Sequence, residues 1–148
     1  MRGQLGCHDS HTKLWERMIE KKIPMALIME DDANLRYDEN MHERIVSIFK
    51  EIKERGIEWD LFYLGRGTGE YRRKLTPHLV TPQEHQGLFC YMLTLRGARI
   101  LVRASHPYRI PVDVLAARVA DGGQLKAIAL TPSLCYVVPV RSDTGHIV

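Results

Sequence analysis

Hydrophobic residues near the start of the chain mark a helix and then a strand. Apolar side chains recur at helical spacing between Ser10, whose hydroxyl suits an N-cap, and Pro24, which ends the pattern. Residues 25–29 are then all apolar, as in a strand buried on both faces of a parallel sheet. Because this run stops abruptly at the acidic triplet 30–32, we expect an acidic loop at the strand's carboxyl end.

The alternation of helix and strand patterns continues toward the middle of the chain. Apolar residues at helical spacing predict a helix over 41–52, with Asp38 as candidate cap and Gly56 as its stop. The apolar segment 59–64 predicts the next strand. This order is typical of an α/β protein whose parallel strands are joined by right-handed crossovers.

The second half of the chain is less regular. Residues 65–74 contain three glycines and a basic run, which predict a mobile surface loop. The remaining apolar patterns predict strands over 88–95, 125–130 and 134–138, and helices over 96–104 and 112–120.

Composition narrows the class of protein. The chain has 148 residues and a mass of 17.0 kDa, which predicts one domain over residues 1–148. With 45% hydrophobic and 26% charged residues, a disordered or fibrous protein is excluded. The net charge of +3 is too small to indicate a nucleic-acid partner.

The sequence also bears on the cellular location of the protein. No apolar run reaches the roughly 18 residues of a membrane span, and no secretion signal is visible, although peripheral contact with a membrane stays open. Cys7, Cys90 and Cys135 are odd in number and widely spaced, which favours reduced thiols over a disulfide framework. We therefore expect a cytoplasmic protein.

Glu30, Asp31 and Asp32 are the first candidates for chemistry. In an open α/β sheet, ligands bind outside the carboxyl ends of the strands, where this triplet is expected. Mg²⁺ and Mn²⁺ prefer oxygen ligands and keep positions open for a substrate phosphate. The triplet is therefore either a site for a metal-bound diphosphate or a solvated acidic turn.

The segment before the first predicted strand holds Cys7, His8 and His11. These residues match no standard zinc spacing and lack a fourth ligand, and a cysteine nucleophile is equally poorly supported. The favoured interpretation is a helix that begins at Ser10 and turns its N-terminus, with a nearby imidazole, toward an anion.

Three more residues have both a plain and a functional interpretation. Arg66 follows a strand without a dinucleotide-binding pattern, so it belongs to a solvated basic loop or reaches a phosphate from a flexible lid. Asp113 follows Pro111-Val112 and is either a helix N-cap or a site carboxylate. Asp143 is either a turn residue or a site residue contributed by the end of the chain.

Several of these segments form an ordered series over nearly the whole chain. They are Gly6-Cys7-x-x-Ser10-His11 with Leu14-Trp15, the run from Ala26 to Asp32, the run from Trp59 to Gly65, Tyr91-x-Leu93-Thr94-Leu95-x-Gly97-Ala98, and Pro111-Val112-Asp113, followed by Pro132 and Ser142-Asp143. Together they resemble glycosyltransferase family 25, which contains lipopolysaccharide β-galactosyltransferases and procollagen galactosyltransferases.

The resemblance implies a Rossmann-like, GT-A-like fold with a mostly parallel sheet flanked by helices. It also implies that the acidic triplet holds Mn²⁺ (or Mg²⁺) on the donor diphosphate, with Asp32 as direct ligand and Asp31 beside it. Ser10 and His11 would lie next to the donor.

The two later acids complete the implied site. Asp113 matches the acid of the family's Pro-x-Asp motif and is expected to act as general base, and Asp143 would complete the metal or acceptor side. The implied reaction is inverting transfer of a hexose, galactose or glucose, from a UDP-sugar to a saccharide, glycolipid or hydroxylated protein, as in lipopolysaccharide biosynthesis.

Other functions stay open beside this one. Family members carry a strand and helix before the Gly-Cys motif, so the chain is expected to be N-terminally shortened, and a second chain could complete the nucleoside pocket. The alternatives are a catalytically inactive, glycosyltransferase-like binding module and a metal-dependent phosphohydrolase.

Overall fold

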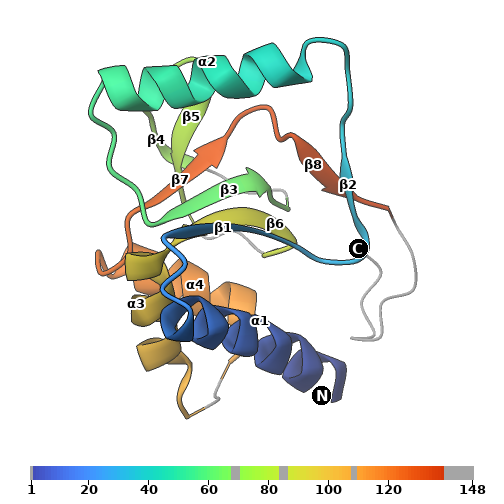
Figure 1. Cartoon of the computed structure of the whole chain (residues 1–148), viewed down its shortest axis with the longest axis vertical. Coiled ribbons are helices and arrows are strands. Elements are labelled where there is room, and N and C mark those ends of the chain that lie inside the picture. The colour runs from blue at the N-terminus through green and yellow to red at the C-terminus, as the bar shows by residue number, and fades with distance from the viewer. Residues whose placement is uncertain (1, 68–70, 84–86, 108–109, 139–148) are drawn as a thin grey trace.

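A central sheet carries α2 on one face and α1, α3 and α4 on the other (Figure 1). This computed structural model describes residues 2–67, 71–83, 87–107 and 110–138. The helices are α1 (Arg2–Glu20), α2 (Met41–Glu54), α3 (Leu95–Ser105) and α4 (Val112–Asp121). The strands are β1 (Met25–Met29), β2 (Ala33–Leu35), β3 (Leu61–Gly65), β4 (Tyr71–Lys74), β5 (Leu79–Pro82), β6 (Cys90–Thr94), β7 (Ala127–Leu130) and β8 (Cys135–Val137).

The strand directions confirm the α/β class but not the mostly parallel sheet. The strand order is β1-β6-β3-β7-β5-β4, and among these described neighbours β3 and β7 alone pair in parallel. Strand β6 lies between β1 and β3 and runs against both. Consequently β1, β3 and β7 still run in the same direction, and the carboxyl ends of β1 and β3 lie at the same end of the sheet. A second, two-stranded sheet pairs β2 with β8.

Burial explains why the direction was predicted wrongly. Along β3, Leu61 and Tyr63 belong to the core shared with α1, α3 and α4, whereas Phe62 belongs to the core shared with α2. A continuous apolar run therefore indicates that helices cover both faces of the sheet at that strand. This is compatible with antiparallel neighbouring strands.

Strand β1 differs from its prediction as a fully buried strand. It lies at the edge of the sheet, and Met25, Leu27 and Met29 are exposed while Ile28 is buried. Only one face of β1 is covered, because α1 packs beneath it and α2 lies over the other end of the sheet (Figure 1).

Helix α1 begins at Arg2, so the expected start at Ser10 is wrong. The Ser10 hydroxyl donates to the Gly6 carbonyl oxygen, one turn earlier, at 2.8 Å. A serine that bonds back to the preceding turn is compatible with a helix interior, which is why its residue type did not mark the helix end. The anion-facing helix N-terminus expected at Ser10 is therefore absent from that position.

The other helices lie close to their predicted positions. Gly56, at φ +60°, ends α2 as expected, because glycine adopts this left-handed backbone without steric cost. Asp38 does not cap α2: the cap is Asn40, whose backbone N–H donates to the Asp38 carboxylate at 2.9 Å.

Three short strands were not predicted. Residues 71–74 fall in the expected mobile loop but form β4, an exposed edge strand paired with β5. Its basic side chains suit an edge, where charge discourages pairing with another chain. Strands β2 and β5 are too short for a periodic pattern to reveal.

Cys90 and Cys135 form a disulfide, so the prediction of three reduced thiols is wrong for this pair. Their Cα atoms are 6.4 Å apart although 45 residues separate them in sequence. Only the packing of β6 and β8 at the end of β3 brings them together, and Cys7 remains the free cysteine. The inference of a cytoplasmic location loses the support it took from the cysteines.

No helix in the described ranges combines the length and the apolar character that a bilayer crossing requires.

Gly65 is expected to tolerate no side chain. A Cβ atom there would lie 2.5 Å from the Phe89 ring and 2.6 Å from the Cys135 Cβ, and the latter is held within β8. Gly65→Ala should therefore lower the free energy of unfolding by about 1–3 kcal/mol, measured by urea denaturation. Gly6→Ala is the matched control, because nothing lies within 4 Å of its added Cβ and a helical alanine is favoured. Equal stability of the two variants would contradict the close packing at Gly65.

Candidate active site at the carboxyl ends of β1 and β3

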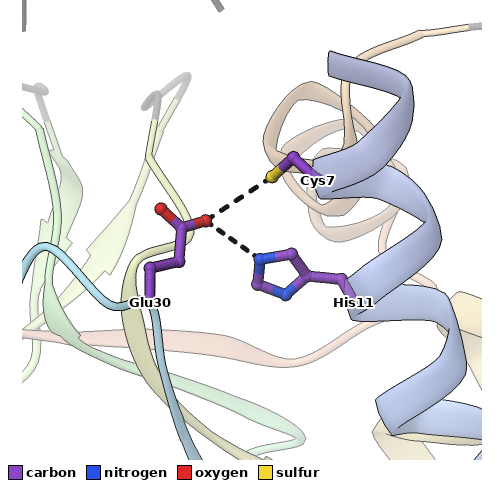
Figure 2. A group of neighbouring side chains, drawn as sticks. All are labelled: Cys7, His11 and Glu30. Atoms are coloured by element: carbon purple, nitrogen blue, oxygen red, sulfur yellow. Dashed lines mark hydrogen bonds and ion pairs between the residues drawn. The ribbon is translucent and has the colours of Figure 1, made fainter. Parts of the chain in front are cut away.

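The end of β1 directs Glu30 toward helix α1. The Glu30 backbone N–H donates to the Phe89 carbonyl oxygen at 2.8 Å, which fixes the chain where β1 stops. From there the Glu30 carboxylate points at Cys7 and His11, which lie one helical turn apart on α1 (Figure 2). The Glu30 Oε1 atom is 2.9 Å from His11 Nε2 and 3.6 Å from Cys7 Sγ.

A chain of hydrogen bonds orients His11 from the core side. Its Nδ1 lies 2.7 Å from the Tyr91 hydroxyl, and the Trp15 indole N–H donates to the same hydroxyl oxygen at 3.0 Å. Because an indole N–H can only donate, the Tyr91 oxygen accepts from Trp15. In the His11 tautomer with its proton on Nε2, that N–H donates to Glu30 and the Tyr91 O–H can donate to Nδ1. Trp15, Tyr91 and His11 are all buried, so their hydrogen bonds form a well-packed support for the Glu30 carboxylate.

The ionisation of these groups follows from their contacts. The hydrogen bond from His11 is the main cause that holds the pKa of Glu30 below its usual value. Burial, with the charge of Glu30 next, raises the pKa of Cys7 to about 12. Burial also raises the pKa of Tyr91 well above its usual value. At neutral pH the cluster is therefore a carboxylate surrounded by protonated donors.

Asp31 and Asp32 follow Glu30 but are placed differently. Asp31 is exposed, whereas Asp32 is half-buried. Its Oδ1 atom is buried and has no hydrogen-bond partner among the described residues. Burial, together with the negative charge of Glu30, raises the pKa of Asp32. A buried carboxylate oxygen without a donor is unfavourable, and a cation is one way to satisfy it.

Asp113 comes to the same region from helix α4. It lies in the first turn of α4 but does not cap it, since the N-cap is Pro111, so the N-cap interpretation is wrong. Its Oδ2 atom instead accepts from the Gly87 backbone N–H at 3.1 Å, before β6. Burial is the main cause that raises the pKa of both Cys7 and Tyr63, and the negative charge of Asp113 adds to the rise in each.

The remaining predicted residues are only partly brought together. Arg66 follows β3 directly and is partly buried, and burial lowers the pKa of its guanidinium. Burial is the main cause that raises the pKa of Tyr63, and the positive charge of Arg66 opposes this rise. Ser10 is exposed on α1, and its hydroxyl bonds back to the Gly6 carbonyl oxygen. Asp143 lies outside the described residues.

Tyr91 and Trp15 are the functional neighbours that sequence reasoning missed. Both have the spacing and chemistry of ordinary core residues, and both are fully buried. The one available signal was that each carries a polar atom, which needs a hydrogen-bond partner when buried.

Tyr91→Phe is expected to lower the free energy of unfolding by about 1–3 kcal/mol, because it leaves the buried Trp15 N–H and His11 Nδ1 without their shared partner. Urea denaturation measures this loss. The half-exposed Tyr71 supplies the control, since Tyr71→Phe should change stability by less than about 0.5 kcal/mol. An unaltered midpoint for Tyr91→Phe would show that the hydrogen-bond chain contributes nothing.

The fold is thus that of an α/β protein in which the Glu30 carboxylate directly follows β1 and the Asp113 carboxylate, on α4, binds the backbone just before β6. The family model "Glycosyltransferase family 25 (LPS biosynthesis protein)" matches residues 1–116. The chain therefore belongs to glycosyltransferase family 25, which confirms the resemblance found in its motifs.

Curated relatives include proteins with and without a named activity. The chain is 33% identical over 118 residues to "Probable inactive glycosyltransferase 25 family member 3" of Bos taurus, covering 76% of this chain and 19% of the relative. It is 27% identical over 164 residues to "Procollagen galactosyltransferase 1" of Danio rerio, covering 99% of this chain and 27% of the relative. For "Procollagen galactosyltransferase 2" of Homo sapiens the identity is 29%, over 99% of this chain and 26% of the relative. The chain thus spans between 19% and 27% of these relatives' length.

Proposed function

We propose that the chain provides the catalytic site of a metal-dependent, inverting glycosyltransferase. The donor would be a UDP-hexose, galactose or glucose, and the acceptor a saccharide, a glycolipid or a hydroxylated protein. The observation that carries the proposal is the pair of separate acids. Asp32 follows β1 and has a buried Oδ1 atom with no partner among the described residues, and Asp113 lies on α4, where the Gly87 N–H holds its carboxylate. Family membership and the names of the galactosyltransferase relatives support the same class of reaction.

The acidic loop after β1 fits a hard divalent cation. The unpartnered Oδ1 atom of Asp32 and the exposed carboxylate of Asp31 are oxygen donors of the kind that Mn²⁺ and Mg²⁺ prefer. We assign these two residues to the metal, with Asp143 as a further candidate beyond the described residues. When bound there, the ion would neutralise charge on the departing nucleotide diphosphate.

Asp113 is the proposed general base. Inverting transfer needs a carboxylate that removes the proton of the acceptor hydroxyl as this hydroxyl attacks the anomeric carbon. A carboxylate has two oxygens, so Oδ2 can keep the Gly87 N–H while the other takes the proton. The hydrogen bond to Gly87 fixes the side chain, which lowers the cost of orienting it for the reaction.

Three residues are assigned to the donor side, and the structure supports them to different degrees: Arg66, Ser10 and His11. Arg66 is a partly buried cation directly after β3, and such a guanidinium suits a phosphate. His11 supports Glu30 from the core, so its contribution to donor binding is to position that carboxylate. Ser10 is exposed on α1, so its assignment to the donor side rests on the Gly-Cys-x-x-Ser-His motif alone.

The test is a panel of UDP-hexoses with and without Mn²⁺, read out as nucleotide binding, nucleotide release and glycosylated product. We expect Mn²⁺-dependent binding, with release of UDP and product from one hexose when a suitable acceptor is present. Absence of nucleotide binding at millimolar concentration would favour the inactive binding module, consistent with the relatives named inactive. Free phosphate without glycosylated product would favour a phosphohydrolase.

A further inference from the structure

We propose that Cys7, His11 and Glu30 form a zinc site with one open coordination position, separate from the Mn²⁺ site of Asp31 and Asp32. Figure 2 shows the three side chains pointing toward one another from α1 and from the end of β1. Cys7 Sγ, one His11 ring nitrogen and one Glu30 oxygen all lie within 4.8 Å of one another, so a single ion between them can contact all three.

The chemistry and the spacing of the ligands both suit zinc. Cys7 and His11 are four residues apart on α1 and therefore share one face of the helix, so both side chains can reach a single ion. Thiolate, imidazole and carboxylate are the three protein ligand types that zinc accepts. A thiolate is a soft ligand and disfavours Mg²⁺ and Mn²⁺, which separates this site from the all-oxygen loop beside it.

Charge also favours a divalent ion at this position. Binding of Zn²⁺ would displace the Cys7 thiol proton to solvent, and the ion would then balance the two negative charges of the thiolate and the Glu30 carboxylate. His11 is 3% exposed and Cys7 half-buried, so the bound ion would be partly shielded from water. Three protein ligands leave the fourth tetrahedral position of zinc for water or a substrate oxygen.

Tyr91 is placed to support His11 as a zinc ligand. When His11 binds zinc through Nε2, its remaining ring proton sits on Nδ1, which lies 2.7 Å from the Tyr91 hydroxyl oxygen. That oxygen has two lone pairs and can accept from both His11 and Trp15. Zinc-bound histidines ordinarily donate their second N–H to such an acceptor. The same three aromatic side chains therefore satisfy the cluster with and without the ion.

Replacing zinc with Co²⁺ in the tag-free chain of 148 residues tests the site. Because Cys90 and Cys135 are joined, Cys7 is the sole thiol available, and a thiolate-to-cobalt charge-transfer band reports its coordination directly. We expect this band, together with the visible bands of a tetrahedral ion, at one equivalent of Co²⁺, and their loss when Zn²⁺ is added. Their absence from the folded wild-type chain would overturn the proposal.

Substitutions assign the ligands. Cys7→Ser should abolish the charge-transfer band, and Glu30→Gln should weaken Co²⁺ binding by at least about 100-fold, since even a residue behind the ligands contributes 10–100-fold. Tyr91→Phe should weaken it by about 10–100-fold. Asp9→Asn is the control, because Asp9 lies on α1 but pairs with Lys13 on the surface. A band that survives in folded Cys7→Ser would place the ion elsewhere and refute the site.

The zinc-site proposal and the transferase proposal can be tested independently of each other. Asp32→Ala should keep the cobalt band while losing Mn²⁺-dependent nucleotide binding. Loss of the band in Asp32→Ala would show that the two acidic regions form a single metal site, contrary to the proposal.

Discussion

Replacing Asp113 with asparagine is expected to lower the rate of sugar transfer by about 10²–10⁴-fold, the usual contribution of a general base. Asparagine has nearly the same shape and can still accept the Gly87 N–H through its amide oxygen, so the start of α4 should stay in place. It cannot remove a proton from an acceptor hydroxyl. Mn²⁺-dependent donor binding should therefore be unchanged while transfer is lost, as measured by binding and product formation on the same protein.

The control for Asp113 lies at the other end of the same helix. Asp121 pairs with Arg72 at 2.7 Å on the surface, and Asp121→Asn should leave transfer unaltered. If Asp113→Asn keeps wild-type transfer, Asp113 is not the base. If it loses donor binding together with transfer, its carboxylate belongs to the donor side of the site.

Asp32→Ala is expected to weaken Mn²⁺-dependent binding of the nucleotide by about 100-fold or more, because it removes the proposed direct metal ligand. Little stability should be lost. The pKa of Asp32 is raised by burial and by Glu30, so its charge is disfavoured in the folded chain and its removal relieves repulsion. Calorimetric titration with UDP and Mn²⁺ measures the binding, and a thermal melt measures the stability.

Asp38→Asn is the control for Asp32, since Asp38 is an exposed acid after β2 whose carboxylate accepts from the Asn40 N–H at the start of α2. Its variant should bind nucleotide like the wild type. A large fall in melting temperature of Asp32→Ala with nucleotide binding intact would make the acidic triplet a structural feature. The metal-dependent mechanism would then lose its principal residue.

The two predictions also separate this chain from an inactive relative. A chain that binds nucleotide with Mn²⁺ but transfers no sugar would keep the effect of Asp32→Ala and show none of Asp113→Asn. A chain without nucleotide binding would show neither effect. The outcome therefore decides which of the two kinds of relative, those named galactosyltransferase or those named inactive, this chain follows.

Most helices and the longer strands could be predicted because they depend on local patterns. The helical spacing around Ile48 and Ile52, with Gly56 after it, places α2 within a few residues of its observed bounds. The end of β1 before Glu30 was likewise evident from the change from apolar to acidic residues. Cap residues were less reliable, as Ser10 and Asp38 show, because a polar side chain can bond to the backbone inside a helix or before it.

By itself, the amino-acid sequence determined the α/β class, the acidic loop after β1 and the motifs of glycosyltransferase family 25. These are properties of residues close together along the chain. Only the tertiary structure decided the direction of β6 between β1 and β3, the pairing of Cys90 with Cys135, and the turn of Glu30 toward Cys7 and His11. Each of those depends on contacts between distant segments, which are fixed when side chains pack against both faces of the sheet and which no local pattern records.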